Sequence, residues 1–182
     1  MEKDTKSLTK LETNSNDNKI DLAKRIDKAF NIALGKFLDS NGKIETVMQT
    51  GEAFGRGLFA DIISEKPKEW TMKQWIDETV ENIISPIGND FSFIEISEDK
   101  AISVMNKSVL HEKSDETIIA SLFTYGFIRG LLKSAFPKGE LVLQDQFSRD
   151  LTNTTFIFKT KSYSRDKFER ERVKNVLSKQ KS

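Results

Sequence analysis

Two pairs of glycines, each with a spacing of four residues, constrain the fold of this 182-residue chain more than any other feature. Gly51 and Gly55 lie in the segment TGEAFGRGLF, and Gly126 and Gly130 lie in TYGFIRGLL. Residues four apart lie on nearly the same face of a helix. A glycine inside a helix costs up to about 1 kcal/mol relative to alanine, so each pair indicates a helix surface against which another element packs very closely.

The composition excludes several classes of function. The formal net charge is +1, so no global field attracts nucleic acid or an anionic membrane. The chain has no cysteine, which removes disulfides, thiol catalysis and thiolate metal sites. No apolar run approaches the ~20 residues that a membrane helix needs, and the polar N-terminus has no hydrophobic signal core. We therefore expect a soluble cytoplasmic protein.

Hydrophobic periodicity predicts an α+β fold. A period of 3.6 residues predicts helices at residues 20–37, 43–64, 71–84 (with Thr71 as the N-cap) and about 118–136. Alternation predicts strands at residues 91–96, 101–105, 141–143 and 154–161. The fourth helix is apolar on most sides, which is typical of a buried helix. We expect an antiparallel sheet of about four strands, formed by two hairpins and packed against a helical layer with one long buried helix.

The chain is predicted to contain one domain with a segment at each end. Residues 1–19 are polar and are expected to form a disordered N-terminal tail. The domain spans residues 20–163, and residues 164–182 are expected to form a charged C-terminal helix. The apolar residues of that helix are Phe168, Val173, Val176 and Leu177. This segment contains more Lys and Arg than Asp and Glu, so it could contact nucleic acid. The alternative is a solvated helix whose apolar side docks on the domain or on a second subunit.

Aromatic residues and one arginine accompany the glycine pairs. The aromatic residues are Phe54, Phe59, Phe123, Tyr125 and Phe127. They could line an apolar pocket or simply fill the core. Arg129 lies in the most apolar helix, where it could bind the carboxylate of a ligand or partner. Alternatively, it is paired inside the protein with a carboxylate such as Glu52, Asp61 or Glu116.

The sequence contains no recognisable catalytic motif. His111 is the only histidine, and a metal site or an acid–base pair needs partners that converge on it. Neither a serine-nucleophile motif nor a phosphate-binding loop is present. We therefore predict that the protein is not an enzyme, with no metal and no cofactor.

Three stretches, in this order and at this spacing, resemble the four-vinyl-reductase domain family. They are the glycine-rich segment 50–58, the hairpin 91–104, and the helix 125–132 with the strands 141–143 and 155–158 that follow it. The family shares a superfamily with the Bet-type subunits of the TRAPP vesicle-tethering complex. That superfamily has the ligand-binding fold of NO-signalling and Golgi-transport proteins. The resemblance covers roughly residues 30–163.

The resemblance implies a homodimer with a hydrophobic channel beside the long helix. The channel would be lined by the five aromatic residues and Arg129, and the four glycines would provide close helix packing. Many members hold a metal through cysteines, whereas the matching positions near Ser121 and between Asp145 and Thr155 contain neither Cys nor His. No zinc site is therefore expected.

The function predicted from these features is a non-enzymatic sensor domain that binds a small apolar ligand and acts in regulation. Its expected partners are a second copy of the chain, a small hydrophobic ligand and a regulatory protein. Two alternatives remain open: a protein-interaction scaffold of the TRAPP Bet type without a ligand, and a DNA-associated regulator that uses the basic C-terminal helix.

Overall fold

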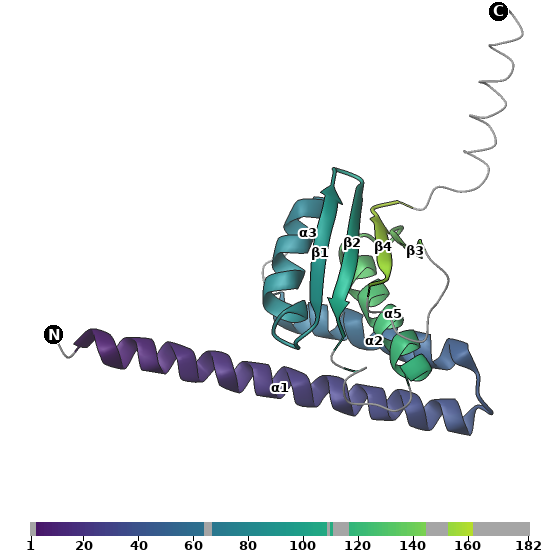
Figure 1. Cartoon of the computed structure of the whole chain (residues 1–182), viewed down its shortest axis with the longest axis horizontal. Helices are drawn as coiled ribbons and strands as arrows, with labels where there is room; N and C mark the ends of the chain where they lie inside the picture. Colours follow the sequence, from purple (N-terminus) through teal and green to yellow (C-terminus); the bar gives the residue numbers. More distant parts are fainter. Residues whose placement is uncertain (1–2, 64–66, 109, 111–116, 145–152, 162–182) are drawn as a thin grey trace, which may run out of the picture.

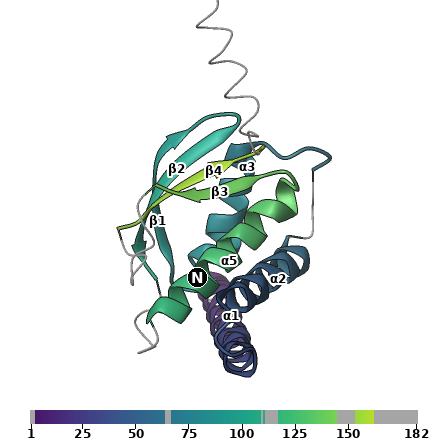
Figure 2. The same cartoon turned by 90° about the vertical axis from the view of Figure 1, so that its right-hand side faces the viewer.

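The computed structural model describes residues 3–63, 67–108, 110, 117–144 and 153–161. The elements are α1 (Lys3–Asp39), α2 (Ile44–Ile62), α3 (Met72–Thr79), the π-helical turn η1 (Val80–Ile84), β1 (Asp90–Ile96), β2 (Lys100–Lys107), α5 (Thr117–Ala135), β3 (Glu140–Leu143) and β4 (Thr155–Lys159). They form a four-stranded antiparallel sheet with the helices packed on one of its faces (Figures 1 and 2), which confirms the predicted α+β fold.

The sheet joins the two hairpins through their second strands. The strand order is β1-β2-β4-β3, so β2 and β4 lie in the centre and β1 and β3 form the edges. Alternate side chains of each strand point toward the helices, and these include Phe91, Met105, Phe156 and Phe158, which are all buried. This alternation follows from the two-residue period of a strand that has one covered face.

Helix α5 is the centre of the core. It lies between α2 and the sheet (Figure 2), so its side chains meet packed neighbours on both sides. Phe123, Phe127, Ile128 and Leu131 have no exposed surface. This agrees with the prediction of one long buried helix.

The helix ends follow signals in the sequence. At the start of α3, the Thr71 hydroxyl accepts a hydrogen bond from the Gln74 backbone N–H, and the Gln74 side chain accepts one from the Thr71 N–H. This reciprocal capping box confirms Thr71 as the N-cap. At the end of α1, Asn41 and Gly42 adopt positive φ angles of 55° and 81° and redirect the chain toward α2. Glycine tolerates this conformation without steric cost.

The N-terminal segment differs from the expectation. We expected residues 1–19 to be a disordered tail, whereas α1 begins at Lys3 and extends beyond the rest of the domain (Figure 1). The physical reason is that no glycine or proline interrupts the chain before Gly35, so nothing ends the helix that the apolar residues after Ile20 establish.

Two other expectations concern the C-terminal segment and membrane-spanning helices. The predicted C-terminal helix at residues 164–182 lies outside the described part of the chain. Within the described part, no helix combines the length and the apolar character that a membrane span requires.

Candidate functional site

The two glycine pairs face each other where α2 crosses α5. A Cβ atom on Gly51 or Gly55 would overlap the backbone carbonyl oxygen of Phe123 or Phe127 in α5. In return, a Cβ atom on Gly126 or Gly130 would overlap the carbonyl oxygen of Met48 or Glu52 in α2. The two backbones are therefore in direct contact, and each pair is the other's packing partner within a single chain.

The phenylalanines of the expected ligand channel pack on one another beside this crossing. Phe123 and Phe127 are fully buried and Phe59 is 1% exposed. The half-buried Phe54 ring lies with its centroid 6.1 Å from that of Phe123 and 5.7 Å from that of Phe127. Phe30 of α1 contacts Phe123 edge-on, with 5.7 Å between the ring centroids. Phe54, Phe123 and Phe127 of the expected lining thus pack together with Phe30 where α1, α2 and α5 meet, whereas Phe59 packs against Trp70.

Arg129 is held by a carboxylate inside the protein. Its Nε donates a hydrogen bond to Glu52 Oε2 at 2.6 Å, and its Nη2 contacts the same oxygen. Arg56 Nη2 donates to the other carboxylate oxygen at 2.7 Å, and Lys133 Nζ lies 3.7 Å from it. The side chain of Glu52 is only 14% exposed. Of the two interpretations of Arg129, the structure shows the internal ion pair with Glu52.

This cluster shifts the ionisation of Glu52. Burial alone would raise the pKa of the Glu52 carboxyl group. The hydrogen bonds from Arg56 and Arg129 and the charges of Arg129 and Lys133 together outweigh that effect and hold the pKa below its ordinary value. Glu52 is therefore the anionic centre of a group of three cations.

Tyr125 and Arg129 also border a shallow, polar surface pocket of about 430 Å³. The Tyr125 hydroxyl donates a hydrogen bond to the Leu141 carbonyl oxygen at 2.9 Å, and burial raises the pKa of Tyr125. Lys133 and Lys138 complete the cationic side of this pocket, and Glu140 is paired with Lys159 at 3.4 Å. The hydrogen-bonding groups of this pocket are thus largely engaged with the protein itself.

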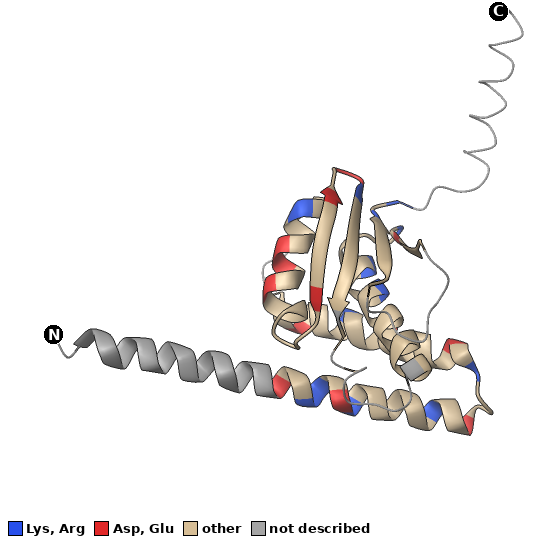
Figure 3. Cartoon of the chain, viewed as in Figure 1, with Lys and Arg blue, Asp and Glu red and all other residues tan. Residues whose placement is uncertain are grey.

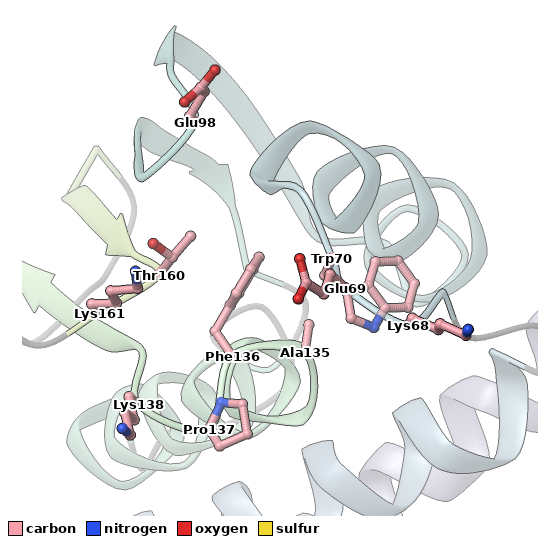
Figure 4. Close-up of a pocket in the computed structure, with 10 residues that line it drawn as sticks. All are labelled: Lys68, Glu69, Trp70, Glu98, Ala135, Phe136, Pro137, Lys138, Thr160 and Lys161. Carbon is pink, nitrogen blue, oxygen red and sulfur yellow. The ribbon is translucent and has the colours of Figure 1, made fainter.

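A larger surface pocket, as open to solvent as the first, lies at the C-terminal end of α5 (Figure 4). It has a volume of about 540 Å³ and is bordered by the segment before α3, the β1–β2 turn and the end of β4. The apolar residues that line it are Trp70, Ala135, Phe136 and Pro137. The charged residues around it are Lys68, Glu69, Glu98, Lys138 and Lys161. Figure 4 shows the Phe136 ring projecting into the middle of the pocket, with Ala135 and Glu69 beside it.

Aromatic contacts hold the floor of this pocket in place. The Trp75 ring packs edge-on against Phe136, with 6.3 Å between centroids, and its Nε1 donates a hydrogen bond to the Leu131 carbonyl oxygen at 3.1 Å. Trp70 packs edge-on against Phe59, with 5.6 Å between centroids. The floor therefore belongs to the same aromatic core that supports α5.

The sequence analysis did not single out Trp70 and Phe136, which line this pocket. Each stands at the boundary of an element: Trp70 directly precedes the N-cap of α3, and Phe136 directly follows α5. Both boundaries can be read from the sequence, but no sequence pattern indicates that they lie close together in space.

The described residues contain no group of three or more His, Cys, Asp or Glu side chains that could hold a metal ion. His111 lies outside the described part of the chain. Comparisons with models of protein families, with curated proteins and with solved structures give no match. The resemblance to the four-vinyl-reductase domain family stays a prediction.

Proposed function

We propose that this chain is a non-enzymatic domain that binds a small amphipathic ligand in the pocket at the C-terminal end of α5. The observation that carries the proposal is the pocket of about 540 Å³, which combines an aromatic floor with a charged rim. Pockets for small molecules typically measure about 300–1,000 Å³ and combine apolar walls with a few polar groups. In this proposal the site is at the end of the long helix, whereas the sequence suggested a channel along its side.

The chemistry of the lining suggests the class of ligand. Phe136 and Trp70 offer aromatic surface to an apolar or aromatic portion of the ligand. The rim holds the ammonium groups of Lys68, Lys138 and Lys161 and the carboxylates of Glu69 and Glu98, so an anionic end of the ligand would meet a small excess of positive charge. Burial of each 100 Å² of apolar ligand surface contributes about 2.5 kcal/mol before the entropic cost of binding. An amphipathic carboxylate, sulfonate or phosphate fits these features.

Ligand binding would act on the segment that joins α2 to α3. Trp70 belongs to that segment, while Phe136 follows α5, so a ligand that contacts both links two parts of the chain that are far apart in sequence. A ligand that binds only the folded arrangement stabilises it in proportion to its concentration and affinity. Ligand binding would therefore stabilise one arrangement of these two parts of the chain, which is how the domain could act as a sensor.

The pocket can be tested with 8-anilinonaphthalene-1-sulfonate, an aromatic anion that fluoresces in apolar surroundings. Ala135 lines the pocket and is half-buried, so Ala135→Phe should fill the space above Phe136. We expect this variant to weaken dye binding by about tenfold or more, equivalent to ~1.4 kcal/mol. The measurement is a fluorescence titration of the full chain.

Ala53→Phe is the matched control, because Ala53 is an exposed residue of α2 that does not line the pocket. It should leave the affinity for the dye unchanged. Equal affinities of the two variants would show that the dye binds elsewhere and would remove the support for this site.

An interaction scaffold is the second candidate function. It is favoured by large apolar side chains that are exposed and do not line the pocket, including Ile94 at 69% and Leu38 at 67%. In this alternative the partner is a second copy of the chain or a regulatory protein. For both candidates we propose the cytoplasm as the location, because a chain without cysteine suits a reducing compartment.

A further inference from the structure

The face of the sheet that points away from the helices carries a row of apolar side chains. Val142 of β3 pairs with Ile157 of β4, which in turn pairs with Ile102 of β2. A bulge between Phe93 and Glu95 adds Ile94, which is 69% exposed, at the β1 edge. We call Val142, Ile157, Ile102 and Ile94 the outer row. None of the described helices covers it (Figures 1 and 2).

The surroundings of the outer row are acidic. The side chains that the structure describes in the strands and in the β1–β2 turn include the carboxylates of Asp90, Glu95, Glu98, Asp99 and Glu140. The same elements contain three lysines, and two of them, Lys100 and Lys159, pair with Glu95 and Glu140. Figure 3 shows the acidic residues at both ends of β1 and in the turn that follows it. The uncovered face therefore favours a basic, apolar occupant.

The sequence that follows β4 has this chemistry. Residues 162–182 contain seven Lys or Arg and three Asp or Glu, together with the apolar residues Phe168, Val173, Val176 and Leu177. The Thr160 backbone N–H donates a hydrogen bond to the Asp99 carbonyl oxygen at 2.9 Å, so the chain leaves the sheet beside the acidic β1–β2 turn. The segment thus starts at one end of the face that it would cover.

The lengths also match. A helix formed by the 19 residues 164–182 would be about 28 Å long at 1.5 Å per residue. The eight residues of β2, the longest strand, span about 26 Å at 3.3 Å per residue. A helix that reverses direction after Lys161 can therefore cover the sheet from one end to the other.

We propose that residues 164–182 fold back as a helix onto the outer row and place the sheet between two helical layers. Val173, Val176 and Leu177, which lie on one side of such a helix, face the row, and the basic residues approach the acidic border. The connection to β4 keeps the segment at an effective concentration of about 1 mM or more, which favours it over a separate partner. Because residues 160 and 161 line the ligand pocket, the segment also leaves the domain at the edge of that site.

Disulfide trapping tests this proposal in the full chain, since the absence of native cysteine makes every engineered pair unambiguous. The test pair is Ile157→Cys with Val173→Cys, at the middle of the sheet and the middle of the segment. The control pair is Ala53→Cys with Val173→Cys, because Ala53 is an exposed residue of α2, and α5 lies between α2 and the sheet. We expect the test pair to form an intramolecular disulfide about tenfold faster than the control pair, at a rate independent of protein concentration. High salt should slow it because it screens the charges.

Two results would overturn the proposal. Equal rates for the two pairs would show that the segment does not lie on the sheet. Covalent dimers whose rate of formation rises with protein concentration would show that a second copy covers the face instead. If circular dichroism shows that Ile157→Cys impairs folding, Ile94→Cys replaces it, because the exposure of Ile94 makes that substitution safe.

Discussion

Replacing Gly55 with alanine should lower the free energy of unfolding by about 3 kcal/mol or more, and we expect the variant to be unfolded at 37 °C. The added Cβ would overlap the carbonyl oxygen of Phe127, which is a backbone atom and cannot swing aside. Gly126 and Gly130 make the reciprocal contacts with α2, so a shift that relieves one clash separates the helices at all four glycines. Urea unfolding followed by circular dichroism measures the change.

Gly57→Ala is the control for this substitution. Gly57 lies in the same helix two residues further on, and a Cβ atom there meets nothing within 4 Å. Alanine should therefore stabilise the protein by roughly 0.5–1 kcal/mol, which is the difference in helix propensity. Similar effects of the two substitutions would contradict the description of the α2–α5 contact.

The second large effect is expected at Glu52. Glu52→Gln removes the anionic centre and leaves Arg56, Arg129 and Lys133 close together without it, so we expect a loss of about 1–3 kcal/mol at pH 7. Asp61→Asn is the matched control. Asp61 pairs with Arg25 at 2.6 Å, but its side chain is 60% exposed, and such surface pairs contribute about 0–1 kcal/mol.

The effect of Glu52→Gln should depend on pH in a defined direction. The folded protein lowers the pKa of Glu52, so the carboxylate adds stability that is fully present above the ordinary value of 4.5. That stability is lost as the pH falls through the lowered pKa. The difference between wild type and variant in the free energy of unfolding should therefore shrink below pH 4.5. A difference that grows on acidification would show that Glu52 is not stabilised as an anion.

The elements were predictable because they depend on local sequence. The expected helix 43–64 is α2 at Ile44–Ile62, and Thr71 is the N-cap through its contact with Gln74 three residues later. The pairing of β2 with β4 was not predictable in the same way, because it joins strands that are separated by α5. The extent of α1 was missed because a polar composition was taken as a sign of disorder, although no helix breaker precedes Gly35.

The candidate pocket was harder to predict than the fold. Periodicity places Phe123 and Phe127 on a buried face, but it does not show whether space remains beside them. That depends on Phe30 of α1 and Phe54 of α2, which lie far away in the sequence and fill the gap. Trp70 and Phe136 meet at one pocket only through the packing of α3 and α5, so no local pattern marks them.

Native mass spectrometry of the freshly purified full chain tests the proposed ligand-binding function most directly. The account predicts a non-covalent mass of a small molecule on the wild-type protein that disappears on denaturation. The same mass should be absent from Ala135→Phe and present on Ala53→Phe. A bare polypeptide mass for the wild type, or equal loading of all three proteins, would contradict a ligand site at the end of α5.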